Sequence, residues 1–284
     1  MAKLLPPEKA KKPESLFAKS LSLAKSSPSK AGLMVLFDVL FLISALALNN
    51  LFRYAAGSMK SPVPTPSSVA VFIVSSLVYF LIILFVYSFF KYIILDFTKS
   101  LFEKTDFSFK KLGRFYLLNV IIAGIFFAAA IILFFIFANI KGPYQIYFFV
   151  FLASPYWVLL GNNVYALFSI PSLLSYVIIN MSHSFFYEGS SIKTALKKSF
   201  KITFTKIKIY RGTILAMILF ALALWLLFLG SGYLIRIIGS KNYILYLSAY
   251  AYFKHASIAI FYIVLYSLIL LNRISFYSIS RENK

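Results

Sequence analysis

The chain has 284 residues, of which 61% are hydrophobic and 13% charged, and it contains no cysteine. A soluble domain is about 45–50% apolar and about 25% charged, so this composition excludes an ordinary soluble fold and predicts an all-α helical membrane protein. The missing cysteines exclude disulfides and thiolate chemistry, and the net charge of +21 lies beside apolar stretches, which argues against a nucleic acid partner.

The N-terminal arm, residues 1–30, is basic, and Ser15 is placed to cap a short helix over 16–24. The first predicted membrane span covers 31–52. An Ala-Leu-Ala sequence at 45–47 resembles a signal-peptide cleavage site. The arm is long for a signal peptide and Asp38 interrupts the apolar core, so we keep the segment as a span.

The second span is predicted over 69–90, extending to Leu95, and the third over 115–138. The connector between them is basic, and Asp106 or Ser108 is expected to cap a short helix that contains Lys110 and Lys111 and leads into the third span. Both lysines are predicted to contact lipid headgroups or a partner.

Two charges lie within the spans, near the ends that face the basic arm. Lys91 is about one turn inside the second span and Asp38 about two turns inside the first. One interpretation is an ion pair between them. The other is that Lys91 extends to the headgroups and Asp38 faces a wet crevice. A third and more specific hypothesis gives Asp38 a role in proton relay.

The fourth apolar stretch starts near Ile146 and continues at least to Ile170, with prolines at 155 and 171. It predicts either one kinked span or a hairpin of two short helices. The hairpin would move the lysines that follow to the outer side, so the charge distribution favours one span. Asn162 and Asn163 then lie near mid-bilayer, where interhelical hydrogen bonding or a substrate pocket would satisfy their amides.

Residues 191–208 are predicted to form an amphipathic helix capped by Ser190 or Ser191. Its apolar face comprises Ile192, Ala195, Leu196, Phe200, Thr203, Phe204 and Ile207. Its basic residues are Lys193, Lys197, Lys198 and Lys201. Such a helix lies on a membrane surface with its lysines over anionic headgroups, although any inner loop is expected to be basic.

The fifth span is predicted over 212–234, and the sixth ends at Asn272 and begins between Tyr243 and Ala256. We favour the later start, with the tyrosines of 243–252 forming an interfacial belt. Residues 31–272 therefore form the membrane domain and 273–284 a tail. Lysine-rich and lysine-poor connectors alternate along the six spans, which predicts a cell-membrane protein with both termini in the cytoplasm.

The segment from Glu188 to Phe200, EGSSIKTALKKSF, resembles the acidic-x-x-x-(E)AL-x-x-S segment that follows the fourth span in some prokaryotic families. These are six-span integral membrane families related to the membrane domain fused to some glycerophosphodiester phosphodiesterases. Thr194 stands where that motif usually has glutamate. The resemblance implies the six-span layout, and it implies no phosphodiesterase activity.

The sequence shows no metal-spaced cluster, paired aspartates, GxSxG or phosphate-binding loop. We therefore expect no catalytic residues, no metal and no cofactor, and an intramembrane enzyme is the least favoured class. The leading hypothesis is a non-enzymatic membrane protein that binds anionic lipid or a partner protein through its basic cytoplasmic face. The alternative is a small transporter or permease-like subunit.

Overall fold

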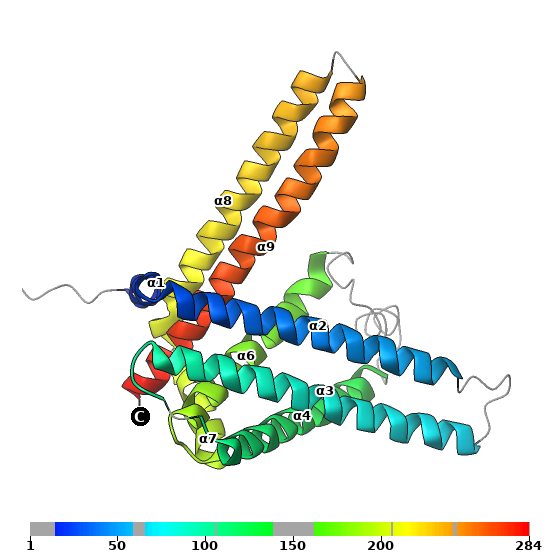
Figure 1. Ribbon diagram of the computed structural model, residues 1–284, viewed down its shortest axis with the longest axis vertical. Coiled ribbons are helices and arrows are strands. Elements are labelled where there is room, and N and C mark those ends of the chain that lie inside the picture. Colours follow the sequence, from blue (N-terminus) through cyan, green and yellow to red (C-terminus); the bar gives the residue numbers. More distant parts are fainter. Residues whose placement is uncertain are drawn as a thin grey trace, which may run out of the picture. The chain divides into compact units, whose positions relative to one another are not determined.

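The computed structural model describes residues 15–58, 66–105, 107–138, 162–205, 207–240 and 243–283 (Figure 1). Within these ranges the chain forms eight helices and no strand, which confirms the predicted all-helical class. Five helices are long enough and apolar enough to cross a membrane: α2 (Pro28–Ser58), α3 (Pro66–Ser100), α4 (Phe109–Ala138), α8 (Ile207–Gly239) and α9 (Tyr243–Glu282). The others are α1 (Leu16–Ser26), α6 (Asn162–Tyr187) and α7 (Ile192–Thr205).

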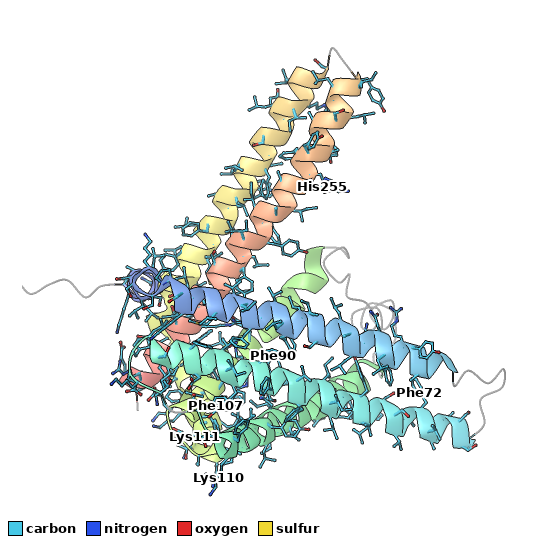
Figure 2. The ribbon with its side chains drawn as sticks, in the orientation of Figure 1. Phe72, Phe90, Phe107, Lys110, Lys111 and His255 are labelled. Atoms are coloured by element: carbon cyan, nitrogen blue, oxygen red, sulfur yellow. The ribbon has the colours of Figure 1, made fainter. Side chains whose placement is uncertain are left out.

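The long helices expose large apolar side chains along most of their length. Phe72 of α3 (labelled in Figure 2) is 51% exposed and Trp225 of α8 is 57% exposed. An apolar surface of this extent is unfavourable in water and matches a hydrocarbon solvent. Within the interior of a helix the backbone N–H and C=O groups bond to one another, as lipid requires. The chain is therefore a membrane protein.

The chain divides into two compact units, Met1–Pro28 with Thr205–Ile279, and Ser29–Phe204 with Ser280–Lys284. In the first unit α8 and α9 form an antiparallel hairpin (Figure 1). The rings of Tyr210 and Phe276 stack at 4.9 Å between these helices. α1 packs on the hairpin, since the hydroxyls of Ser20 and Ser275 are 2.9 Å apart. Ser15 caps α1, as predicted, by accepting a hydrogen bond from the Ala18 N–H at 3.2 Å.

In the second unit the core lies between α3, α4 and α6. Its buried apolar residues are Tyr92, Leu95, Leu112, Phe115, Leu118 and Ile122. α2 packs against α3 through aromatic rings, such as Phe37 and Phe97, which stack at 5.6 Å. The Thr98 hydroxyl also lies 3.4 Å from the Met34 sulfur. This packing fixes the ends of α3, α4 and α6 relative to one another, and it therefore positions the basic residues described below.

The structure confirms most predicted span positions and lengthens the helices. Ser108 directly precedes α4, and its carbonyl accepts a hydrogen bond from the Leu112 N–H at 3.1 Å, so the short helix after the basic connector does lead into the third span. Much of the fourth predicted stretch lies outside the described residues. The choice between a kinked span and a hairpin therefore stays open, although α6 is helical through Pro171.

The last helix is continuous from Tyr243 to Glu282, a length of 40 residues. At about 1.5 Å per residue it spans about 60 Å, twice the thickness of the hydrocarbon core, so part of it extends beyond the bilayer. The interfacial tyrosine belt at its start stays a prediction. Residues 273–282, which the sequence places in a tail, continue the helix, and Ile274, Phe276 and Tyr277 are buried.

Candidate functional site

A sharp corner joins α6 to α7. Gly189 has a φ of 102°, a left-handed conformation that favours glycine because a Cβ would be strained there. The Ser190 N–H donates to the Phe185 carbonyl at 3.1 Å and the Gly189 N–H to the Phe186 carbonyl at 3.0 Å, which is a Schellman motif. Ser191 then caps α7 by accepting a hydrogen bond from the Thr194 N–H at 3.3 Å.

α7 is packed against the protein along a stripe of small residues. Ala195, Ser199 and Thr203 are almost fully buried, and the hydroxyls of Ser199 and Ser182 lie 2.7 Å apart. Small side chains let the two helices approach closely. The predicted apolar face is therefore divided in two: Ala195 and Thr203 pack inside the protein, whereas Phe200 and Phe204 are 42% and 63% exposed.

The lysines predicted to contact lipid or a partner are mostly exposed. We define the basic face as the exposed lysines of the first turn of α4 and of α7: Lys110, Lys111, Lys193, Lys197 and Lys201. Figure 2 shows Lys110 and Lys111 at the start of α4. Lys198 differs from them, because it is half-buried and its ammonium lies 5.7 Å from the centre of the Phe185 ring. Lys198 therefore interacts with its own protein.

An open pocket of about 590 Å³ lies where the α6–α7 corner meets α4, and we call it the corner pocket. Its lining residues are Tyr92, Lys111, Arg114, Leu117, Phe186, Tyr187 and residues 189–193. Lys111 and Lys193 are distant in the sequence, and the fold brings them to one cavity. Arg114 joins them. The sequence treats Arg114 only as one charge in a basic connector, although its position one turn after Lys110 and Lys111 was an available signal.

Part-buried hydrogen bonds hold one wall of the corner pocket. The Tyr187 hydroxyl donates to Asp96 Oδ1, and the Thr105 hydroxyl donates to Asp96 Oδ2 at 3.2 Å. Burial raises the pKa of Tyr187, and the hydrogen bond to Asp96 raises it further, so the phenol stays protonated and donates. The Asp96 carboxylate is thus engaged by two donors beside the pocket.

A second group of polar side chains, the polar network, is buried between α3, α4 and α6. Lys91 Nζ donates to Asn180 Oδ1 at 3.0 Å. Asn119 Nδ2 donates to Ser88 Oγ at 2.9 Å, and Asn119 Oδ1 lies 2.7 Å from His183 Nε2. All five residues are less than 9% exposed.

Of the polar network, only Lys91 was singled out from the sequence. One signal was available: Ser88 and Lys91, and likewise Asn180 and His183, are spaced at i and i+3, which places each pair on one helix face. Asp38 is half-buried on α2, and its predicted ion pair with Lys91 stays a prediction. The side chains of Asn162 and Asn163 lie outside the described residues.

Among the described residues, no three histidine or acidic side chains are grouped in a way that could hold a metal ion. Comparisons of the chain with protein-family models, with curated proteins and with solved structures find no match. The resemblance of the segment 188–200 to the six-span families stays a prediction. The function is therefore argued from the geometry of the basic face, the corner pocket and the polar network.

Proposed function

We propose that the protein is a non-enzymatic multi-pass protein of the cell membrane whose basic face binds anionic lipid headgroups on the cytoplasmic side. The observation that carries this proposal is the way α7 packs against the rest of the protein. Its small residues are buried in the protein, so Lys193, Lys197 and Lys201 stay exposed on a helix whose other side is packed. A helix attached in this way presents its charges at a fixed position along the spans.

The exposed aromatic residues of α7 support the same proposal. At about 100° per residue around the helix axis, Phe200 lies between the buried stripe and the exposed lysines, and Phe204 lies between Lys193 and Lys197. Apolar side chains flanked by lysines are typical of helices that lie in the interfacial region of a bilayer. Each lysine near an anionic surface contributes about 1 kcal/mol, so three together favour anionic over neutral lipid by about 3 kcal/mol.

Insertion of α7 can be measured with a single dye, because the chain has no other cysteine. Phe204→Cys is labelled with a polarity-sensitive fluorophore, and the protein is reconstituted into nanodiscs with or without phosphatidylglycerol. We expect a blue-shifted emission with phosphatidylglycerol that reverts at high salt, because salt screens exposed charges. Unchanged emission in both lipids would contradict the proposal and favour a protein partner for the basic face.

Two charge variants make this measurement specific. Lys193→Gln, Lys197→Gln and Lys201→Gln together are expected to abolish the lipid-dependent shift. The control removes three exposed cations that lie on or near lysine-poor connectors. Its substitutions are Arg53→Gln, Arg236→Gln and Lys254→Gln, and they lower the net charge by the same amount. If the control removed the shift equally, net charge rather than the basic face would govern the binding.

The second candidate function is a small transporter or permease-like subunit, which the polar network favours. A buried lysine and a buried histidine within packed apolar helices are typical of ion and solute pathways. This function predicts solute uptake by proteoliposomes that Asn180→Leu abolishes while the protein still inserts. Lipid dependence of α7 with no uptake for a panel of ions and small solutes would favour the first function.

A further inference from the structure

The corner pocket concentrates positive charge within a concave site. Lys111 and Arg114 reach it from α4 and Lys193 reaches it from α7. None of the three forms an ion pair with another described residue, and no acidic side chain is among the described residues that line the pocket. An anion in the pocket would therefore meet three cationic side chains whose charges are not already compensated there.

Backbone donors add to this positive field. The first intrahelical bond of α7 joins the Ala195 N–H to the Ser191 carbonyl at 2.8 Å, and Thr194 N–H is taken by the Ser191 hydroxyl. The N–H groups of Ile192 and Lys193 precede that bond, and both residues line the pocket. Unbonded N–H groups at a helix start, together with the helix dipole, favour an oxyanion such as phosphate.

Arg114 suits a phosphate group in particular. A guanidinium presents a planar pair of donors that matches two oxygens of a phosphate, whereas an ammonium acts as a point charge. The side chain of Arg114 is exposed toward the pocket region, so it can adopt that bidentate geometry. Lys111 and Lys193 then supply further charge from two different helices.

An apolar track leads away from the corner pocket along α4. Leu117, which lines the pocket, is 50% exposed, and Ile121 and Ile125 follow it at i+4 spacing with 36% and 47% exposure. These three side chains lie on one face of a membrane-crossing helix. A ligand with a phosphate in the pocket and hydrocarbon along this track would match both surfaces, and this arrangement separates a phospholipid from free phosphate.

We propose that the corner pocket is a discrete site for one anionic phospholipid, whose phosphate is held by Lys111, Arg114, Lys193 and the first N–H groups of α7. The acyl chains of this lipid lie along Leu117, Ile121 and Ile125. This inference rests on the proposed function, because it assigns to the basic face a stoichiometric lipid site in addition to general attraction to an anionic surface.

The test uses the full chain, delipidated in a non-ionic detergent, with dioctanoyl phosphatidic acid as the probe. Native mass spectrometry counts bound lipid, and a titration gives its dissociation constant. We expect one saturable lipid, and Arg114→Gln or Lys193→Gln should weaken its binding about tenfold or more, because each removes one charge-assisted contact. Arg114→Lys keeps the charge but loses the bidentate geometry. Its affinity for the lipid should lie between that of the unmodified protein and that of Arg114→Gln.

Two comparisons distinguish this discrete lipid site from general attraction to the basic face and from a site for free phosphate. Lys197→Gln with Lys201→Gln changes exposed lysines outside the pocket and should leave the saturable site intact, although it weakens the response of α7 to phosphatidylglycerol. If these two substitutions weakened the site as much as Arg114→Gln, the discrete site would be wrong and the basic-face function would stand. If inorganic phosphate or glycerol 3-phosphate bound as tightly as the lipid, the phospholipid assignment would be wrong.

The variants can be checked for folding independently of binding. Arg114 is exposed, so the midpoint of thermal unfolding without lipid should be unchanged in Arg114→Gln. Leu117→Asn and Ile121→Asn test the acyl track. They should weaken phosphatidic acid binding and leave any binding of glycerol 3-phosphate unaltered. Unaltered phosphatidic acid binding in both variants would exclude the proposed acyl track.

Discussion

His183 Nε2 and Asn119 Oδ1 lie 2.7 Å apart, in a site where His183 has no exposed surface and Asn119 only 3%. Since Asn119 Nδ2 donates to Ser88, the Asn119 carbonyl oxygen is the acceptor and His183 Nε2 carries the proton. Asn119 therefore links α3 and α6 from its position on α4. The other ring nitrogen, Nδ1, is buried without a hydrogen bond to any described residue.

Replacing Asn119 should destabilise the packing of α3, α4 and α6. Asn119→Leu has nearly the same volume and leaves the buried groups of His183 and Ser88 without their partner, so we expect a loss of about 1–3 kcal/mol. Thermal unfolding in detergent measures this loss. The control is Ser267→Ala, which removes only a bond to a carbonyl of its own helix and should change stability by less than about 0.5 kcal/mol. Equal effects would argue against a structural role for the polar network.

Two glycines of α8 should respond in opposite ways to alanine. A Cβ at Gly239 would lie 2.6 Å from Tyr246 Cβ and 2.9 Å from Tyr246 Cα, so Gly239→Ala should force the α8–α9 turn apart. A Cβ at Gly230 meets nothing within 4 Å, and Gly230→Ala should stabilise the helix by up to about 1 kcal/mol. Unfolding midpoints and protease sensitivity of the turn measure both. A tolerated Gly239→Ala would show that α8 and α9 are further apart than described.

The buried stripe of α7 should reject larger side chains. Ala195 has no exposed surface, so Ala195→Leu overpacks this buried position and should lower the stability of the protein by about 1–3 kcal/mol. The matched control is Thr194→Leu, an exposed position one residue earlier. Hydrogen exchange of α7 reports detachment of the helix. Faster exchange in Ala195→Leu alone is expected, and equal exchange in both variants would mean that α7 is not held by this stripe.

The orientation of the spans can be tested by single cysteines in the cysteine-free chain. The lysine distribution predicts that α7 faces the cytoplasm and that the C-terminal end of α2 faces outward. Tyr54→Cys, at a side chain that is 80% exposed, should react with a membrane-impermeant maleimide in intact cells. Lys197→Cys should react only after permeabilisation. The reverse pattern would overturn the predicted topology and the cytoplasmic placement of the basic face.

The Tyr187–Asp96 hydrogen bond predicts a stability loss at high pH. Burial and Asp96 raise the pKa of Tyr187, so the folded protein keeps the proton after the unfolded chain has lost it near pH 10. Stability from this group is fully present below about pH 10 and falls as the pH rises further. Tyr187→Phe should reduce this alkaline slope and lower stability at neutral pH by about 0.5–1.5 kcal/mol, because Asp96 loses a donor. The exposed Tyr54→Phe is the control for the slope in denaturant unfolding.

The sequence predicted the elements of this fold well where one physical signal dominates. Long uncharged apolar stretches, such as 31–52 within α2 and 212–234 within α8, cross the hydrocarbon core only as helices, so composition and length suffice to find them. Ser15 and Ser191 also mark helix starts correctly, because capping depends on local hydrogen bonds.

The polar network and the corner pocket depended on tertiary structure. Asn119 and His183 look like ordinary residues in an apolar context, and only the packing of three helices brings them within a hydrogen bond. In the same way, the sequence does not distinguish Lys111, Arg114 and Lys193 from its many other basic residues. They line one pocket only because the α6–α7 corner lies against α4 in the fold. Hydropathy and the length of the apolar stretches thus determined the membrane class and the helices, because those depend on the solvent around each segment. Which polar side chains meet was decided by helix packing, because residues distant in the chain come together only in the folded protein.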